Sequence, residues 1–211
     1  MKNAIVLLAS IALATNAGAQ TRFNSQPGKS SVKLQGSSTF HDWEMEGRVI
    51  GGYFELGSGV AIDAAKGAIT GLKGEVLPAT VRANISLTTI HSKAEHLPEV
   101  MDNLMLGYMN ATNYPTIRYI SSSLTVTNSG PGKPFECSAT GDLSIAGVTN
   151  KMTFPVTLAM PDPTHLEAAG TVHFKMTDFK VSPPAPHPLG LPTMKCGDDI
   201  TIIFDWVLQK R

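Results

Sequence analysis

Ser38, His41 and Asp42 are the three side-chain types of a hydrolytic triad, and they stand close together in the sequence. Such a triad needs a histidine base beside the serine and a carboxylate that orients the histidine. Here the histidine and the aspartate are consecutive in a segment with strand character, and consecutive strand residues point to opposite faces. We therefore expect no catalytic residue in this cluster. We expect His41 to form a hydrogen bond at the rim of the fold, beside Trp43.

The six histidines, at positions 41, 91, 96, 165, 173 and 187, do not form a metal-binding pattern. His91 and His96 are five residues apart, whereas two ligands on one helix face are four apart. The sequence also contains no covalent haem motif, no glycine-rich phosphate loop and no carboxylate pair with the spacing of acid–base catalysts. We therefore predict no metal site, no covalent cofactor and no enzyme activity.

The composition favours a β-rich fold that does not bind polyanions. Of 211 residues, 42% are hydrophobic, and 19 glycines and 14 prolines make the chain dense in turns. The 17 basic residues balance the 17 acidic ones, so no basic field exists to hold nucleic acid. The length fits one barrel or sandwich domain.

The first 19 residues have the pattern of a secretory signal peptide. Lys2 precedes an apolar run at 4–14, and Ala17-Gly-Ala19 supplies the small residues that signal peptidase recognises. A membrane anchor is the alternative, but the run is shorter than the roughly 18 residues that span a bilayer, and no second run reaches that length. We expect cleavage after Ala19, a flexible segment over 20–29 and a folded domain over 30–211. The localisation would be periplasmic or secreted.

Export would place Cys137 and Cys196 in an oxidising compartment, where thiols pair. We therefore predict a disulfide between them. It would close a loop of about 60 residues and stabilise the fold by roughly 4 kcal/mol. Two free thiols that never meet are the alternative.

Alternation of apolar and polar residues predicts antiparallel strands along most of the chain. Val81, Ala83, Ile85 and Leu87 alternate with polar residues, which is typical of a strand with one wet face. Related patterns predict strands at 31–35, 41–50, 52–57, 67–74, 116–127, 136–146, 152–160, 172–176 and 200–208. Turn-rich stretches such as 128–134 separate them, as an all-β meander requires.

One segment, about 96–109, breaks the alternation and predicts an amphipathic helix. Apolar residues recur there at three- and four-residue spacing, at Leu97, Met101, Leu104, Met105, Tyr108 and Met109. Pro98 stands in the first turn, where its missing N–H costs nothing. Long strands with a single helix favour a closed sheet, because closure removes exposed edges.

Four sequence blocks occur in an order shared with a known family. They are Ser38-Thr-Phe-His-Asp-Trp43 with Gly47 and Gly52-Tyr-Phe54; 90–109 leading to Asn113-Tyr-Pro-Thr-Ile-Arg-Tyr119; Gly141-Asp-Leu-Ser-Ile-Ala-Gly-Val-Thr149; and Thr177-Asp-Phe179. Together they resemble the YceI-like family of lipocalin-like, polyisoprenoid-binding periplasmic proteins, over about 30–208. The resemblance implies an extended eight-stranded antiparallel β-barrel with one short helix near its mouth. It also implies an elongated apolar tunnel that holds a long isoprenoid or other lipid.

This resemblance makes side chains inside the barrel candidates for ligand contact. The helix methionines are flexible and polarizable enough to adapt to an irregular hydrocarbon, although the same residues could only seal one end of the barrel. Each aromatic candidate could line the tunnel, belong to a solid core or face outward. The predicted ligand-binding residues are Trp43, Phe54, Val81, Ile85, Met101, Leu104, Met105, Met109, Tyr119, Met176, Phe179, Phe204 and Trp206.

We therefore expect an exported, non-enzymatic binding protein that shields a polyisoprenoid, a quinone-like molecule or another lipid from water. Each buried methylene contributes about 0.8 kcal/mol, so binding needs no catalytic group. Two alternatives stay open: an enzyme acting on a lipid inside the tunnel, and a stress-response or assembly protein that uses its outer surface. Apolar inward residues also suit a solid core, so alternation alone does not establish a cavity. Pairing of two copies as a homodimer is left open too.

Overall fold

The computed structural model describes residues 20–26, 28–185 and 194–211. The predicted signal peptide, 1–19, lies outside the described residues. The strands are β1 (Thr21–Ser25), β2 (Ser31–Ser38), β3 (Trp43–Gly47), β4 (Ile50–Leu56), β5 (Ala61–Asp63), β6 (Ala68–Thr70), β7 (Ala79–Ser86), β8 (Ile90–Ser92), β9 (Thr116–Asn128), β10 (Phe135–Ile145), β11 (Val148–Asp162), β12 (His165–Lys175) and β13 (Cys196–Lys210). The helix α1 spans Pro98–Tyr108, and short 3₁₀ helices span Leu87–Thr89 and Met176–Phe179.

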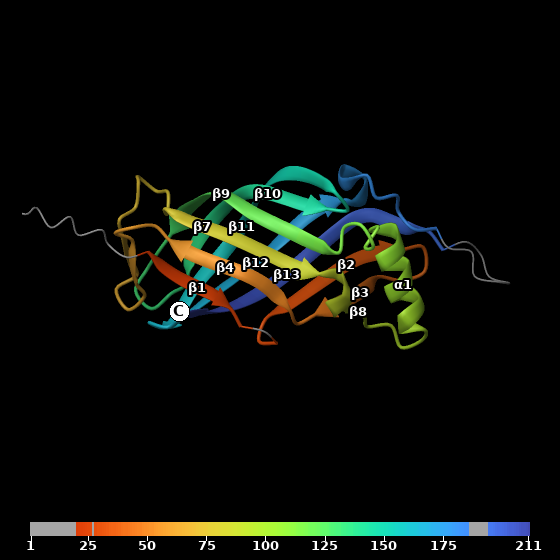
Figure 1. Ribbon diagram of the computed structural model, residues 1–211, viewed down its shortest axis with the longest axis horizontal. Coiled ribbons are helices and arrows are strands. Elements are labelled where there is room, and N and C mark those ends of the chain that lie inside the picture. Colours follow the sequence, from red (N-terminus) through yellow and green to blue (C-terminus); the bar gives the residue numbers. More distant parts are fainter. Residues whose placement is uncertain (1–19, 27, 186–193) are drawn as a thin grey trace, which may run out of the picture.

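Eight strands close into an antiparallel barrel in the order β1-β4-β7-β9-β10-β11-β12-β13. The ring closes because β1 pairs with both β4 and β13. Figure 1 shows that the barrel is elongated, with α1 at one end and the C-terminus near the other. The predicted all-β, eight-stranded barrel with one short α-helix is confirmed.

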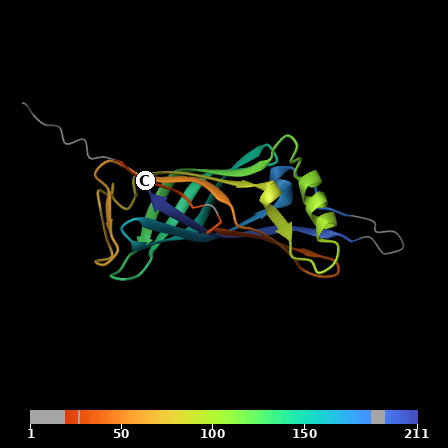
Figure 2. The same ribbon diagram turned by 60° about the horizontal axis from the view of Figure 1, so that its bottom comes forward.

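The barrel wall divides at the end that carries α1. There β13 pairs with β2 over 196–205, whereas its last residues, 208–210, pair with β1. Beyond β2 the sheet continues through β3 to β8. Within the described residues β8 pairs with no strand other than β3, so its outer edge is a free sheet edge. Figure 2 shows this branch and α1 together at the same end of the molecule.

The helix α1 covers the free edge of β8. The carboxylate of Asp102 accepts the backbone N–H of Ser92 at 2.6 Å, and its second oxygen lies 2.8 Å from Nδ1 of His91. An unpaired edge N–H is thereby satisfied by a side chain instead of a further strand. The predicted helix, about 96–109, is confirmed with slightly narrower bounds. No helix among the described residues is long and apolar enough to cross a membrane.

Alternation along the strands builds the interior of the barrel. On β10 the buried side chains of Phe135, Ala139, Leu143 and Ile145 alternate with residues that are more exposed, such as Asp142. The hairpin from β10 to β11 turns through Ala146 and Gly147, whose φ angles of 49° and 82° are those of a type I′ turn. This turn fixes the register, so residues of β10 that face the lumen pair with residues of β11 that also face it.

Two predictions about chain segments are corrected by the structure. The segment 20–29, which we expected to be flexible, contains β1, and Phe23 is almost fully buried between β4 and β13. Its five residues are too few for a clear alternation, and its partners lie far away in sequence. The strand expected at 67–74 is limited to β6, which pairs with β5 in a separate two-stranded sheet.

The predicted disulfide is not formed, because Cys137 and Cys196 are both free thiols. Cys137 lies on β10 between Val126 and Val156. Cys196 begins β13 opposite Ser38, at the end of the barrel that carries α1. The strand order therefore places the two cysteines in different surroundings, which a count of cysteines cannot reveal.

Candidate ligand-binding site: two apolar cavities in the barrel

Two cavities with apolar walls lie inside the barrel. The first, which we call the helix cavity, has a volume of about 100 Å³ and is lined by Leu34, Trp43, Met45, Met101, Leu104, Met105, Tyr108, Met109, Ile117, Ile145, Phe174, Met176, Phe179, Val181, Pro184, Met194, Cys196 and Ile200. The second, the central cavity, has a volume of about 90 Å³ and is lined by Ile50, Phe54, Val81, Ala83, Ile85, Ile117, Tyr119, Ser121, Leu124, Ala139, Leu143, Phe154, Val156, Leu158, Ala168, Val172, Ile202, Phe204 and Trp206.

The two cavities follow one another along the barrel. Ile117 on β9 lines both of them. On β10, Ile145 lines the helix cavity and Leu143 lines the central cavity; on β13 the same step runs from Ile200 to Ile202. Residues two apart on a strand are consecutive positions on one face, about 6.6 Å apart. The cavities therefore lie end to end along the barrel.

The structure places all thirteen predicted ligand-binding residues on the walls of these cavities. The helix cavity receives Trp43, Met101, Leu104, Met105, Met109, Met176 and Phe179. The central cavity receives Phe54, Val81, Ile85, Tyr119, Phe204 and Trp206. Sequence reasoning missed Phe174 and Val172, although both share the inward phase of the same strand, β12. It also missed Met194 and Cys196, which follow a proline-rich segment without strand periodicity.

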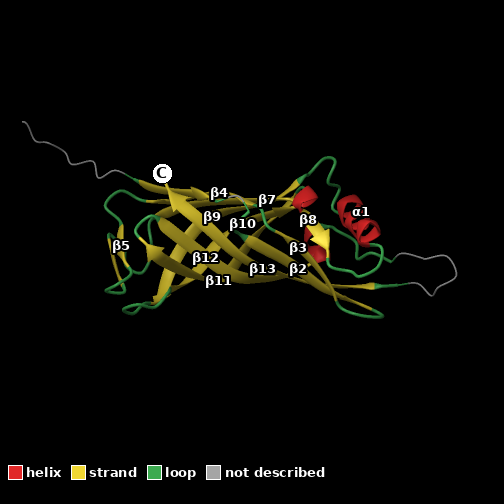
Figure 3. Ribbon diagram, turned by 90° about the horizontal axis from the view of Figure 1, so that it is seen from below, coloured by secondary structure: helices red, strands yellow, loops and turns green. Residues whose placement is uncertain are grey.

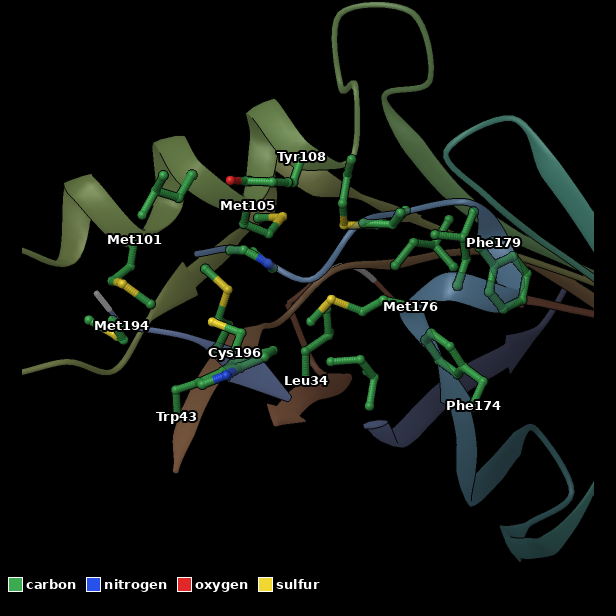
Figure 4. A pocket seen from close by; sticks show the side chains of 18 residues that line it. Leu34, Trp43, Met101, Met105, Tyr108, Phe174, Met176, Phe179, Met194 and Cys196 are labelled. Atoms are coloured by element: carbon green, nitrogen blue, oxygen red, sulfur yellow. The ribbon is translucent and has the colours of Figure 1, made fainter. Parts of the chain in front are cut away.

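Methionine side chains form much of the wall of the helix cavity. Six of the nine methionines line it: Met45, Met101, Met105, Met109, Met176 and Met194. Met101, Met105 and Met109 are four residues apart and so share one face of the α1 segment. Figure 4 shows Met101 and Met105 on the helix, with Met176, Met194 and Cys196 around the same space. Thioether side chains are flexible, so this wall can change shape without a change of fold.

Three aromatic rings on the cavity walls lie over glycines of the neighbouring strand. The pairs are Trp43 with Gly36, Tyr119 with Gly141 and Phe204 with Gly170. A Cβ atom at Gly141 would lie 2.6 Å from Oη of Tyr119, and one at Gly170 would lie 2.8 Å from Cζ of Phe204. The rings thus occupy space that a side chain would fill. They pack against the wall, which leaves room in the barrel for the cavities.

Polar groups in the central cavity differ in how they are satisfied. The indole N–H of Trp206 donates to Oγ of Ser25 at 2.8 Å, and that hydroxyl donates to the carbonyl of Gly52 at 3.0 Å. The hydroxyl of Tyr119 is buried and has no hydrogen-bond partner. Burial, with a smaller contribution from the negative charge of Asp142, raises the pKa of Tyr119 to about 12. This side chain, like any tyrosine, carries its proton at neutral pH.

Comparison with protein families identifies the domain. Residues 23–208 match the YceI-like domain, which covers the barrel except for the first two residues of β1 and the last two of β13. The chain belongs to the YceI-like family. No curated protein matches it.

Solved structures share the fold of this YceI-like protein at low sequence identity. BcnA of Burkholderia cenocepacia is 19% identical with a TM-score of 0.60, and the match covers 87% of this chain and 98% of that chain. A polyisoprenoid-binding domain from Saccharophagus degradans is 11% identical with a TM-score of 0.61, covering 90% and 98%. A YceI protein of Campylobacter jejuni is 15% identical with a TM-score of 0.50, covering 79% and 84%. These likenesses show the YceI-like fold.

The Ser38, His41 and Asp42 cluster of this YceI-like protein holds a loop together. Oγ of Ser38 donates to the main-chain carbonyl of His41 at 2.7 Å and accepts the N–H of His41. Nδ1 of His41 lies 2.8 Å from the main-chain carbonyl of Asp42. These contacts shape the connection between β2 and β3 next to Trp43. No group of three His, Cys, Asp or Glu residues among the described residues is arranged to hold a metal ion.

A third cavity lies outside the series formed by the first two. It has a volume of about 530 Å³, and its lining mixes apolar residues such as Phe23 with charged ones such as Asp63 and Lys210. Residues of β1 and β5 line it. Figure 3 shows β5 at the end of the YceI-like barrel opposite α1. None of the thirteen predicted ligand-binding residues lines it.

Proposed function

We propose that this protein binds one long apolar molecule, a polyisoprenoid, quinone-like molecule or other lipid, in the helix and central cavities together. The observation that carries the proposal is the end-to-end arrangement of two apolar cavities that share Ile117. It is supported by membership of the YceI-like family and by the fold shared with a polyisoprenoid-binding domain.

The volumes fit this use when the walls are allowed to adapt. At about 100 and 90 Å³, each cavity is smaller than the roughly 150 Å³ apolar cavity that accepts benzene in an engineered protein. A hydrocarbon chain therefore enters only as the side chains of the walls move apart. Rotation of Met101, Met105 and Met109 widens the helix cavity for a branched ligand. Burial of the chain, at about 0.8 kcal/mol per methylene, supplies the affinity without catalytic chemistry.

The proposal places the protein in the periplasm as a carrier. The signal-peptide pattern of residues 1–19 supports export, and the YceI-like family is typically periplasmic. Sequencing the N-terminus of the protein recovered from a periplasmic extract tests this part. The expected first residue is Gln20, and retention of Lys2 in the mature chain would contradict it.

The chain offers a direct test of binding because it has two tryptophans, one on each cavity. Trp43 lines the helix cavity and Trp206 lines the central cavity. Trp43→Phe therefore leaves a reporter in the central cavity, and Trp206→Phe leaves one in the helix cavity. We choose 9,10-dibromooctadecane as the probe, since bromine quenches tryptophan fluorescence on contact.

Both single-tryptophan variants are expected to lose fluorescence in the same titration, at one probe per protein. Quenching in neither variant up to the solubility limit of the probe would overturn the proposed function. Quenching of only one tryptophan would contradict the occupation of both cavities by one ligand. Native mass spectrometry of the same samples gives the stoichiometry independently.

A further inference from the structure

Tyr119 carries the one buried side-chain polar atom without a hydrogen-bond partner among the described residues. It lies on β9, opposite Leu143 on β10 and Ala83 on β7, and it lines the central cavity. Its ring centroid is 5.2 Å from that of Phe154. An unpaired buried hydroxyl lowers stability, and almost all such groups in proteins find a partner. The missing partner of Tyr119 therefore needs an explanation.

In the part of the chain that the structure describes, no group forms a hydrogen bond with this hydroxyl. The neighbouring strand offers Gly141 beneath the phenol, and a Cβ there would lie 2.6 Å from Oη. The facing side chains of Leu143, Phe154 and Ala83 are apolar. The phenol packs over Gly141, and its O–H can rotate towards an acceptor that comes close.

Ser121 is the next lumen-facing residue on β9, and it also lines the central cavity. Its Oγ accepts the backbone N–H of Val81 at 2.9 Å, which leaves its own proton available. Residues two apart on one face of a strand are about 6.6 Å apart. Tyr119 and Ser121 thus bring two hydroxyl groups to one side of the central cavity, just behind its apolar surface, so a ligand reaches them when the side chains of the wall shift.

Two donors in an apolar cavity call for an acceptor that brings no donor of its own. A tyrosine hydroxyl is protonated at neutral pH and so can donate, and burial raises the pKa of Tyr119 further, to about 12. A carbonyl oxygen meets this need, because it accepts hydrogen bonds and adds no proton that would require a partner. A pure hydrocarbon would leave the phenol unpaired in the complex, as it is in the free protein.

We propose that Tyr119 is a specificity-determining residue that donates a hydrogen bond to a carbonyl oxygen carried by the apolar ligand in the central cavity. The inference rests on the proposed function and narrows its ligand class to ketones, quinones and esters with long hydrocarbon chains. The ligand then inserts with its carbonyl deep in the barrel, at the level of Tyr119, and with hydrocarbon towards α1.

The test compares matched competitors for the dibrominated probe on the wild type and on Tyr119→Phe. The competitors are n-octadecane and octadecanones whose carbonyl stands at carbons 2 to 9, so that one member reaches Tyr119. We expect the best ketone, relative to the alkane, to lose about tenfold in affinity on going from the wild type to Tyr119→Phe. The affinity for the alkane is expected to stay the same or to rise.

A matched control separates this role from a structural one. Tyr114→Phe makes the same change at an exposed tyrosine and is expected to leave the ratio of ketone to alkane affinity unchanged. Tyr119→Phe without ligand is expected to unfold at the same or a higher urea concentration, because an unpaired buried hydroxyl is removed. A lower midpoint would show a structural partner and overturn the inference.

The outcomes distinguish this inference from the proposed function. An unchanged ratio of ketone to alkane affinity in Tyr119→Phe overturns the role of Tyr119 while leaving lipid binding intact. Failure of the wild type to bind the probe, the alkane and every ketone overturns both.

Discussion

Glycine and aromatic residues act together to keep the lumen of this barrel open. Trp43 lies over Gly36 of the paired strand, and its indole N–H donates to the carbonyl of Ser37 at 3.1 Å. The ring therefore lines the helix cavity without filling it. A side chain at Gly36 would push the ring into the lumen. A glycine opposite an aromatic residue is thus part of the binding site, although it has no side chain to contact a ligand.

Met105 offers the sharpest residue-scale test of the helix cavity. Met105→Lys places a charge beside a hydrocarbon site, and a charge is strongly disfavoured there unless it is paired. In the Trp206→Phe protein, where Trp43 is the reporter, we expect Met105→Lys to weaken binding of the dibrominated probe at least tenfold. Met105→Leu preserves volume and polarity, so its affinity is expected to change by less than about threefold. Equal affinity of the Met105→Lys and Met105→Leu variants for the probe would show that the bound chain does not pass Met105.

The two thiols are expected to differ in reactivity. Cys137 is buried, and burial raises its pKa to about 11, whereas Cys196 is partly exposed and lines the helix cavity. Iodoacetamide at pH 8 is expected to label Cys196 in the native protein and Cys137 only after unfolding. Mass spectrometry of tryptic peptides measures both. Bound octadecanone is expected to slow the labelling of Cys196, while equal labelling of both thiols in the native state would contradict this arrangement.

At the scale of elements, the turn between β11 and β12 contains a carboxylate, Asp162, whose hydrogen bonds make the stability of the fold depend on pH. Asp162 accepts hydrogen bonds from the hydroxyl and N–H of Thr164, at 2.6 and 2.7 Å, and its other oxygen lies 2.7 Å from Nδ1 of His165. The Thr164 hydroxyl is the largest cause, and together these contacts lower the pKa of Asp162 to about 2. The carboxylate thus stabilises the folded state above its unfolded pKa.

This contribution is expected to disappear as the pH falls from about 4 to about 2. Asp162→Asn is therefore expected to be less stable than the wild type at pH 6, with the difference shrinking in that window. Urea unfolding at a series of pH values measures the difference. Thr164→Val removes one donor and is expected to show a weaker form of the same effect. A difference that stays constant from pH 6 to pH 2 would rule out the Asp162 carboxylate as its cause.

Strand patterns were readable from the sequence where the alternation was long, and unreadable where it was short. The series at 152–160 and 200–208 correspond to β11 and β13. In contrast, β1 is buried through a pairing with β13, whose residues lie more than 180 positions away. The residues facing the lumen followed from the same alternation. The division of the lumen into two cavities did not, because it depends on how rings pack over glycines in neighbouring strands.

At the scale of the whole molecule, the barrel wall branches at the end that carries α1, and one side chain joins the helix to this branch. Asp102 joins α1 to the free edge of β8 through Ser92 and His91. The helix carries Met101, Met105 and Met109 to the helix cavity or its border. A ligand that enters or leaves at this end has to move these side chains or the helix. We therefore expect the Asp102 contacts to slow the exchange of a ligand that passes through this end.

Asp102→Ala is expected to accelerate release of the dibrominated probe without removing any residue that lines a cavity. Hydrogen bonds to a charged group contribute about 1.5–3 kcal/mol, so loss of both contacts is expected to raise the dissociation rate by about tenfold or more. The rate is measured by stopped flow, as the recovery of tryptophan fluorescence when excess octadecane, which carries no bromine, replaces the probe. Asp102→Asn keeps an acceptor for the Ser92 N–H and is expected to lie between the two. An unchanged rate in Asp102→Ala would mean that ligands pass through another part of the barrel, since the β8 edge would then play no part in exchange.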